Sequence, residues 1–353
     1  MEEIYNNIIN QHNLIKVSLI GKGGYGTVYL VKKDNNLFAM KIIGINKKVK
    51  KQQLLKESIH SIQQELSWSK NMNSLYCVNT LSIFKDELKD YIIFSMVMEI
   101  AKYNDLKYFT YYYFENNILS LNNKIKNKLN NLTVKYFLYQ IFQSLTFLKE
   151  HLLVHCDIKL ENYLLCNHFV LKLTDFSCMK LLKENEDLQL KSSTWNIKGK
   201  EYYSNNKIVN YSNAFKIDIY CAGLMIYKLR YNKYIIDKDL KDYFNDKNIK
   251  DINKCEKINK KIEESIKFIK QDNEIEEDFK NILISMIQYD INDRSNIENL
   301  LNNKWINEHE IINKIKKINE TEEIKLFLEF EKYKLNKRKR FKFIFKKKVK
   351  IFK

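Results

Sequence analysis

The sequence predicts an α+β protein with two lobes, the first rich in strands and the second helical. Residues 14–43 contain apolar, β-branched runs on either side of a glycine-rich segment, followed by a turn and a third extended run. After residue 98, apolar residues instead recur at intervals of three and four, as in amphipathic helices. A chain of 353 residues is long enough to bury a core in each lobe. This change of period indicates the fold class.

Individual elements follow from the same patterns. Extended runs are expected within 14–43 and again over 91–98, where the residues are almost continuously apolar. Helices are expected over about 52–70 and over 134–149, the clearest amphipathic segment. The Asn- and Lys-rich stretches 116–131 and 233–261 have no clear period and are interpreted as insertions or long loops.

Composition limits the classes of protein to which the chain can belong. Hydrophobic residues make up 45% of the sequence, too many for a disordered polar chain. No apolar run reaches about 18 residues, the length that crosses a bilayer. The start of the chain carries Glu2 and Glu3 and lacks the apolar core of a secretory signal. The six cysteines form no C-x-x-C pair. We therefore expect reduced thiols and an intracellular protein, cytoplasmic or nuclear.

Positive charge is concentrated near the C-terminus. The formal net charge is +18, and residues 332–353 carry twelve Lys or Arg and no acidic residue. Apolar residues such as Phe341 and Phe343 are interleaved with these cations. We expect residues 307–353 to form a helical, basic tail. It could be a nuclear-import signal, a site for anionic membrane lipid or nucleic acid, or a solvated extension.

The glycine-rich segment fits the pattern G-x-G-x-x-G-x-V. Its residues are Gly21, Lys22, Gly23, Gly24, Tyr25, Gly26 and, after Thr27, Val28. Four of the seven glycines of the chain lie in six consecutive positions. Glycine allows the close backbone approach that a phosphate-binding loop needs, although a tight hairpin turn would use it as well. Because a strand pattern follows the last glycine, the segment does not fit a dinucleotide-binding motif, which requires a helix there.

The next strand carries a lysine among apolar residues, Ala39-Met40-Lys41. Burying an unpaired ammonium group is costly, so Lys41 needs an anionic partner. The helix expected over 52–70 offers Glu57 and Glu65. We favour Glu65 because its distance to the turn at residues 73–78 suits a helix packed behind the sheet.

Two further motifs follow in the second lobe. Residues 155–165 have the sequence HCDIKLENYLL, and residues 174–177 have the sequence TDFS. With the glycine-rich segment and Lys41, they resemble in order and spacing the motifs of eukaryotic-type serine/threonine protein kinases, H-R-D-x-K-x-x-N and D-F-G. The resemblance covers roughly residues 14–306.

The resemblance implies a bilobal fold, with a small antiparallel β-rich N-lobe and a larger α-helical C-lobe. The implied organisation is an N-terminal extension over 1–13, an N-lobe over about 14–98, a hinge over about 99–101, a C-lobe over about 102–306 and the tail over 307–353. The buried helix that begins near Asp218, and the closing helices around Arg294 and Trp305, also resemble those of the family.

The resemblance also implies a chemical role for each polar residue of the motifs. Asp157 would accept the proton of the substrate hydroxyl, and Lys159 would steady the γ-phosphate of ATP. Asn162 and Asp175 would bind Mg²⁺, which prefers oxygen ligands. Lys41 would hold the α- and β-phosphates. A lysine two residues after the aspartate resembles the Ser/Thr-directed subclass.

Further ATP contacts are implied around the adenine, the hinge and the ribose. They are Val28, Ala39 and Leu164 around the base, Met98, Glu99, Ile100 and Ala101 at the hinge, Asp105 near the ribose and Glu65 behind the lysine. For Met98, Val28 and Leu164, ordinary core packing is the alternative.

Five positions depart from the pattern of the family. Cys156 replaces an arginine, Leu160 a proline, Ser177 a glycine, and, within 199–207, Lys200 a threonine and Lys207 a glutamate. The last change removes the ion pair expected with Arg294, which must then find another partner. Cys156 cannot grip a phosphate, so we expect activity to depend little on phosphorylation of Ser192, Ser193 or Thr194.

The function expected from these motifs is Mg²⁺-ATP-dependent phosphorylation of Ser/Thr hydroxyls on a protein substrate. Two alternatives belong to other classes. The chain could be a pseudokinase that serves as a binding or scaffold module, given its altered activation segment. In the second alternative the basic tail is the main functional element.

Overall fold

The computed structural model describes most of the chain up to residue 306. The described residues are 1–23, 26–48, 52–101, 103–117, 131–166, 170–190, 200, 208–237, 240, 242–243, 246 and 248–306. Several predictions concern residues outside these ranges, namely Gly24, Tyr25, Ser192, Ser193, Thr194, Gly199, Lys207 and the tail 307–353. Within the described ranges, no helix is long and apolar enough to cross a membrane.

The N-lobe contains a five-stranded antiparallel sheet with the strand order β1-β2-β3-β5-β4. The strands are β1 (Ile15–Gly23), β2 (Gly26–Lys33), β3 (Asn36–Asn46), β4 (Thr80–Glu87) and β5 (Tyr91–Met98), and α2 (Gln52–Asn71) lies between β3 and β4 in the chain. The strands predicted within 14–43 and over 91–98 and the helix predicted over 52–70 are therefore confirmed.

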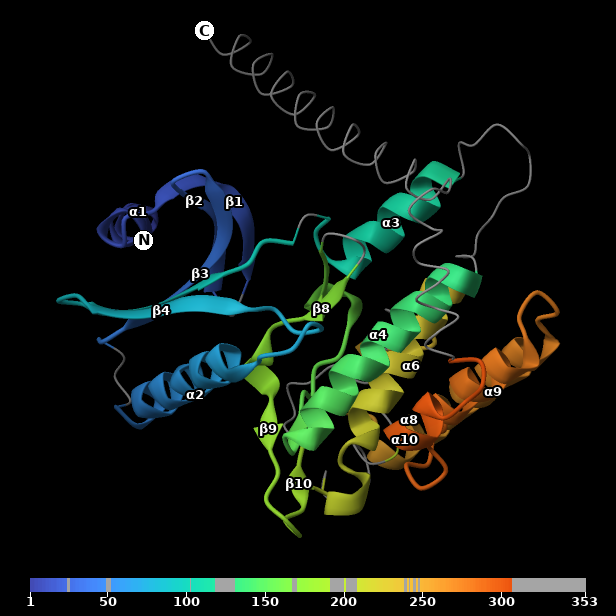
Figure 1. Ribbon diagram of the computed structural model, residues 1–353. Coiled ribbons are helices and arrows are strands. Elements are labelled where there is room, and N and C mark those ends of the chain that lie inside the picture. Colours follow the sequence, from blue (N-terminus) through green and yellow to red (C-terminus); the bar gives the residue numbers. More distant parts are fainter. Residues whose placement is uncertain are drawn as a thin grey trace, which may run out of the picture.

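The two faces of this sheet are covered by different helices. Along β5, Ile92, Phe94 and Met96 pack with Leu66 of α2, whereas Ile93 and Val97 belong to the core on the other face. That other core is closed by α1 (Glu2–Gln11), which contributes Tyr5, Ile8 and Ile9. Figure 1 shows α1 and α2 on opposite sides of the sheet. Alternation of side chains along the strands allows both faces to be buried.

The helix α1 was not expected from the sequence, which we interpreted over 1–13 only as an extension. Polar contacts attach both of its ends to the sheet. Lys16 of β1 donates to Glu2 (3.0 Å) and Asn6 (2.9 Å), and Gln11 and His12 both contact Asp86 of β4, at 3.1 and 3.0 Å. The first residues of the chain are thus an integral part of the N-lobe core.

The C-lobe is mainly helical, with short two-stranded pairs near the N-lobe. Its helices are α3 (Leu106–Asn117), α4 (Asn131–Glu150), α6 (Lys216–Tyr231), α8 (Asp251–Gln271), α9 (Glu277–Met286) and α10 (Ile297–Leu301), and its single-turn 3-10 helices are η1 (Leu160–Asn162), η3 (Phe176–Cys178) and η5 (Tyr211–Asn213). Its strands are β6 (Leu153–Val154), β7 (Tyr163–Leu165), β8 (Leu171–Leu173), β9 (Lys180–Leu181), β10 (Leu188–Gln189) and β11 (Ile208–Val209).

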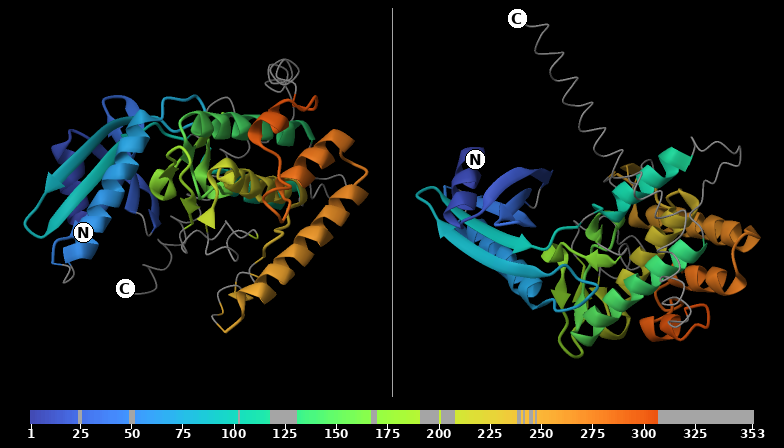
Figure 2. Two further views of the ribbon diagram at one scale, coloured as in Figure 1. Left: turned by 90° about the horizontal axis from the view of Figure 1, so that it is seen from below. Right: turned by 45° about the horizontal axis from the view of Figure 1, so that its top comes forward.

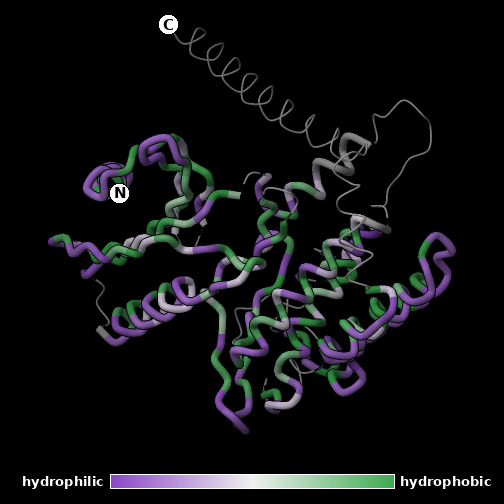
Figure 3. The backbone as a smooth tube through the Cα atoms, in the orientation of Figure 1, coloured by the Kyte–Doolittle hydropathy of each residue, from purple (hydrophilic) through white to green (hydrophobic). Residues whose placement is uncertain are grey.

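The largest hydrophobic core lies in this lobe, around α4 and α6. The predicted apolar face of α4 is buried, with Val134, Leu138 and Ile141 fully inaccessible to solvent. Apolar stretches run through these inner segments, and hydrophilic residues are frequent on the outer α8 (Figure 3). Figure 2 shows α8 and α9 at the end of the C-lobe that is remote from the N-lobe sheet. The predicted α+β fold with a β-rich N-lobe and a helical C-lobe is confirmed.

One element was predicted wrongly. The stretch 233–261 was interpreted as an insertion or long loop, but its second part is helical, because α8 starts at Asp251. Its buried residues Lys254, Ile258 and Ile262 recur every four positions and form one helical stripe among exposed lysines and glutamates. The high proportion of Asn and Lys concealed this period. Of the other proposed loop, 116–131, residues 118–130 lie outside the described part.

Candidate active site

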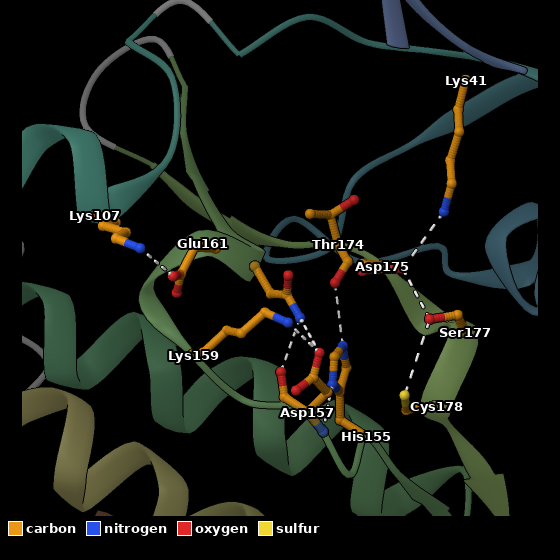
Figure 4. Close-up of polar contacts among 11 residues, drawn as sticks. Lys41, Lys107, His155, Asp157, Lys159, Glu161, Thr174, Asp175, Ser177 and Cys178 are labelled. Carbon is orange, nitrogen blue, oxygen red and sulfur yellow. Dashed lines mark hydrogen bonds and ion pairs between the residues drawn. The ribbon is translucent and has the colours of Figure 1, made fainter. Parts of the chain in front are cut away.

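Lys41 of β3 points from the sheet toward the C-lobe. Its Nζ donates to Glu65 Oε1 of α2 at 2.6 Å and to Asp175 Oδ1 at 3.4 Å. Glu65, rather than Glu57, is thus the anionic partner, and only 4% of Glu65 is exposed. Burial alone would lower the pKa of Lys41, but the charges of Glu65 and Asp175 more than offset it and raise that pKa. The lysine therefore stays charged next to two carboxylates, and Figure 4 shows its contact with Asp175.

Asp157 is the centre of the second group of polar contacts. Lys159 Nζ donates to Asp157 Oδ2 at 2.5 Å. Asn162 Nδ2 donates to the backbone oxygen of Asp157 at 2.8 Å and to Oδ2 at 3.1 Å. The three side chains come from one short segment that ends in η1, so the spacing D-x-K-x-x-N itself brings them together (Figure 4). They present one carboxylate and one ammonium group side by side.

The backbone beneath Asp157 is held from two directions. Asp218 of α6 accepts hydrogen bonds from the backbone N–H groups of His155 (2.6 Å) and Cys156 (2.9 Å). Burial raises the pKa of Asp218 to about 7, while these two donors oppose the rise. The ring of His155 accepts from the Asp157 N–H at Nδ1 (3.3 Å) and donates from Nε2 to the Thr174 carbonyl (3.1 Å). Both contacts orient the segment that carries Asp157.

Asp175 follows β8 in a left-handed conformation, with φ of 62°. Its Oδ1 accepts a hydrogen bond from Ser177 Oγ at 3.0 Å in addition to the contact with Lys41. Burial would raise the pKa of Asp175, but Lys41 and the Ser177 hydrogen bond are among the groups that together lower it below its usual range. The carboxylate is therefore ionised at neutral pH.

Asn162 and Asp175 fit a magnesium ion. Asn162 donates from Nδ2, and within the described part of the chain neither its Oδ1 nor Asp175 Oδ2 accepts a hydrogen bond. The Thr174 N–H donates to the Asn162 carbonyl at 2.9 Å and ties the two segments together. The described residues contain no group of three or more His, Cys, Asp or Glu that could hold a metal. Phosphate oxygens of a nucleotide and water would have to complete the coordination shell of Mg²⁺.

The apolar residues predicted around adenine are half-buried. They are Val28, Ala39 and Leu164, and Met98, predicted beside the hinge, is half-buried as well. Ala39 and Met98 are paired across β3 and β5, and Val28 is paired with Lys41 across β2 and β3. Leu164 forms a bridge with Asp105 on the C-lobe side. The sheet register therefore brings Ala39 next to Met98 and Val28 next to the lysine.

Two of the predicted ATP contacts use their carboxylates elsewhere. Glu99 Oε1 and Oε2 accept from Lys172 Nζ of β8 at 2.7 and 2.8 Å, and Oε1 also accepts from the Asn79 N–H at 2.6 Å. Asp105 Oδ1 accepts from the Tyr108 N–H at 2.8 Å and caps the start of α3. The Glu99 N–H donates to the Asn79 carbonyl at 3.1 Å, so the predicted hinge contact with a base rests on the Glu99 carbonyl and on the backbone of half-buried Ala101.

Two charged residues of this region were missed from the sequence, Lys172 and Lys107. Lys107 of α3 pairs with Glu161 of η1 at 2.7 Å (Figure 4). A lysine among 61 basic residues gives no signal of its own, because only the fold shows which carboxylate it meets.

The described residues of the glycine-rich segment belong to the paired strands β1 and β2. Lys22 pairs with Thr27, and Gly23 with Gly26. Gly26 has a φ of 124°, and a Cβ there would lie 2.8 Å from the backbone oxygen of Ile42. Glycine is required at this position because β2 packs against β3. Gly21 lies at the end of β1, and Gly24 and Tyr25 are outside the described residues.

The departures from the family pattern have local partners. Lys200 pairs with Asp290 at 2.5 Å. Arg294, which lost its expected glutamate, donates to the backbone oxygens of Gln288 (2.7 Å) and Tyr289 (3.1 Å) and lies 4.2 Å from the centre of the Tyr220 ring. These contacts stabilise a buried guanidinium group.

Cys156 and Leu160 are buried in the C-lobe core. Burial raises the pKa of the Cys156 thiol, so this residue is neutral where the family has a cation. The arginine position thus supplies packing and no charge.

Comparison with known proteins shows the family of the chain. The family model described as the protein kinase domain matches residues 14–306. The geometry defines a two-lobed protein in which a lysine–glutamate pair of the N-lobe contacts Asp175 of the C-lobe. The chain belongs to the protein kinase family, of the eukaryotic type.

Its relatives among characterised proteins are distant. Serine/threonine-protein kinase atg1 of Dictyostelium discoideum is 26% identical over 295 residues, which cover 82% of this chain and 38% of that protein. The cAMP-dependent protein kinase catalytic subunit of the same organism is 27% identical over 61% of this chain and 29% of its own length. Serine/threonine-protein kinase 32C of Mus musculus is 24% identical over 60% of this chain and 39% of its own length. The chain thus spans between 29% and 39% of these relatives.

Proposed function

We propose that this chain transfers the γ-phosphoryl group of Mg²⁺-ATP to serine or threonine hydroxyls of a protein substrate inside the cell. The observation that carries the proposal is the pairing of Lys41 with both Glu65 and Asp175, which joins the N-lobe to the segment after β8. A lysine fixed between two carboxylates is placed to neutralise phosphate charge, the main requirement of phosphoryl transfer.

Each side chain then has a defined task. Asp157 accepts the proton of the substrate hydroxyl while the oxygen of that hydroxyl forms a bond to the γ-phosphorus. The bond between the γ-phosphorus and the oxygen that bridges it to the β-phosphorus breaks, and ADP leaves. Lys159, 2.5 Å from Asp157, neutralises charge on the transferred group. Asn162 and Asp175 would hold Mg²⁺, which supplies charge neutralisation at the phosphate oxygens. Lys41 orients the α- and β-phosphates.

The remaining predicted residues would enclose the nucleotide. Residues Gly21 to Gly26 would cover the phosphates, Val28, Ala39 and Leu164 the base, and the backbone at Met98, Glu99 and Ala101 the hinge edge of adenine. We infer that the catalytic domain spans residues 14–306 and that α1 is attached to it as part of its N-lobe core.

The test compares the wild-type chain with Asp157→Ala and Asp157→Asn in Mg²⁺-ATP turnover on a mixed protein substrate. We expect both variants to lose at least about 10²-fold in kcat/KM while they bind ATP as the wild type does, since they lose the proton acceptor but keep the phosphate-binding groups. Equal turnover by wild type and variants would contradict the proposal.

The second candidate function is that of a pseudokinase, and it is favoured by the altered residue at position 200. Lys200, which replaces a threonine of the family pattern, contacts Asp290 at the surface of the C-lobe. Nucleotide binding by the wild type without phosphoryl transfer to protein, including to itself, would establish this alternative.

The basic tail 332–353 is proposed to bind an anionic membrane surface or nucleic acid. Full-length protein and a 1–331 truncation can be titrated with anionic vesicles and with duplex nucleic acid at two salt concentrations. Binding to a polyanion should weaken steeply with salt and disappear on truncation. Equal, weak binding by both proteins would show that the tail is not a binding element.

A further inference from the structure

Ser177 stands where the family pattern has a glycine, and its hydroxyl contacts the proposed metal ligand Asp175. Its Oγ donates to Asp175 Oδ1 at 3.0 Å. Asp175 Oδ1 also accepts a hydrogen bond from Lys41 Nζ at 3.4 Å. A glycine at this position has no side chain and could make no such bond. The departure therefore adds a donor to the carboxylate (Figure 4).

Both contacts of Asp175 fall on one of its two oxygens. Within the described part of the chain, Oδ2 accepts no hydrogen bond. A carboxylate whose Oδ1 is fixed by two donors cannot rotate freely, so Oδ2 keeps one direction. The backbone adds to this restriction, because Asp175 is in the left-handed region and η3 begins directly after it.

We propose that Ser177 is a positioning residue that fixes the Asp175 carboxylate with Oδ2 turned toward the magnesium ion of the nucleotide complex. This inference rests on the proposed function, in which Asp175 is a ligand of Mg²⁺. Groups that hydrogen-bond to a metal-binding carboxylate orient it, and their loss typically costs ten- to a hundredfold in metal affinity or activity. For Ser177 we expect a loss near the tenfold end of this range, because Lys41 also holds the carboxylate.

The experiment measures nucleotide binding rather than turnover. The probe is a non-hydrolysable ATP analogue, titrated by calorimetry into the full chain at a series of Mg²⁺ concentrations and in EDTA. For Ser177→Ala and Ser177→Gly we expect the Mg²⁺ concentration for half-maximal tight binding to rise about tenfold. Binding in EDTA should stay within about twofold of the wild type, because no metal is then involved.

Two further variants separate orientation from packing. Ser177→Thr keeps the hydroxyl and should restore the Mg²⁺ dependence of the wild type. Ser285→Ala in α9 removes a comparable hydroxyl, which donates to the Ile282 carbonyl at 2.8 Å far from the site, and should leave the dependence unchanged.

The possible results distinguish a failure of the role proposed for Ser177 from a failure of the proposed function. If the wild type binds the Mg²⁺ complex and Ser177→Ala has the same Mg²⁺ dependence, the inference alone is overturned. Equal impairment of the Ala, Gly and Thr variants would also overturn it, because packing and not the hydroxyl would then be responsible. If the wild type shows no Mg²⁺-dependent binding, the proposed function fails, and the inference fails with it.

Discussion

The two faces of the N-lobe sheet differ in what their side chains do, and β3 shows the contrast within three residues. Met40 and Ile42 have no exposed surface and pack against the core that α1 closes. Lys41, between them, points to the opposite face and contacts Glu65 and Asp175. Because side chains alternate along a strand, one face can provide stability while the other provides charge for chemistry. The two roles should then be separable by mutation.

The largest loss of kcat/KM is expected from substitutions of Lys41 and of the carboxylate that it contacts. Lys41→Met or Asp175→Ala should lower kcat/KM by about 10²-fold or more, because each removes charge stabilisation of the transferring phosphoryl group. Circular dichroism and urea denaturation should show that the fold is largely intact. Retention of more than about a tenth of wild-type kcat/KM in either folded variant would contradict the role assigned to that residue.

The opposite result is expected on the face covered by α1. Ile8 and Ile9 are 2% and 0% exposed, so Ile8→Ala and Ile9→Ala should each lower the free energy of unfolding by about 2–4 kcal/mol. The kcat/KM of the folded fraction should stay within about threefold of the wild type. Asn7→Ala on the exposed side of the same helix is the control for α1 itself. A large loss of kcat/KM with unchanged stability would show that α1 acts on the active site.

The same contrast explains what could be predicted from the sequence. The polar residues of the candidate site belong to short motifs with fixed spacing, so Lys41, Asp157, Asn162 and Asp175 could be selected before their neighbours were known. The choice of Glu65 over Glu57 was also correct, because a buried ammonium group requires a carboxylate within reach.

The contacts that α1 makes with the other face of the sheet belong to no such motif. The helix α1 is short, and Tyr5, Ile8 and Ile9 become informative only when an apolar sheet face is known to need a cover. The role of Lys172 could not be predicted from the sequence either, because its partner Glu99 is 73 positions away. The prediction of an insertion or long loop over 233–261 failed from residue 251 onward for a related reason, because a helix with a narrow apolar stripe resembles a polar loop in composition.

A third, smaller effect is expected where β5 ends and the hinge begins. Lys172→Met leaves the Glu99 carboxylate with only the Asn79 N–H, and both partners are mostly buried, with 13% and 29% of the side chains exposed. We expect a loss of about 1–2 kcal/mol in the free energy of unfolding. Adding Glu99→Gln should recover part of it, because no uncompensated charge then remains. An equal or larger loss in the double variant would show that the charge pair is not the source.

The smallest effect concerns Gly44, the position in β3 over which α1 packs. A Cβ there would lie 2.8 Å from Met1 Cε, 2.9 Å from the Tyr5 hydroxyl oxygen and 3.3 Å from Ile93 Cδ1. Gly44→Ala should therefore cost about 1 kcal/mol of stability, at the low end for overpacking because the end of Met1 can move.

Tyr5→Phe tests whether this crowding is the cause. Removing the hydroxyl makes room for the new methyl group, so the double variant Gly44→Ala/Tyr5→Phe should be more stable than the sum of the two single losses predicts. Urea denaturation of the four proteins measures this coupling, and kcat/KM should stay near the wild-type value in all of them. Strict additivity would mean that Gly44 does not make room for Tyr5. A fall in kcat/KM without a change in stability would mean instead that the two faces of β3 are not independent.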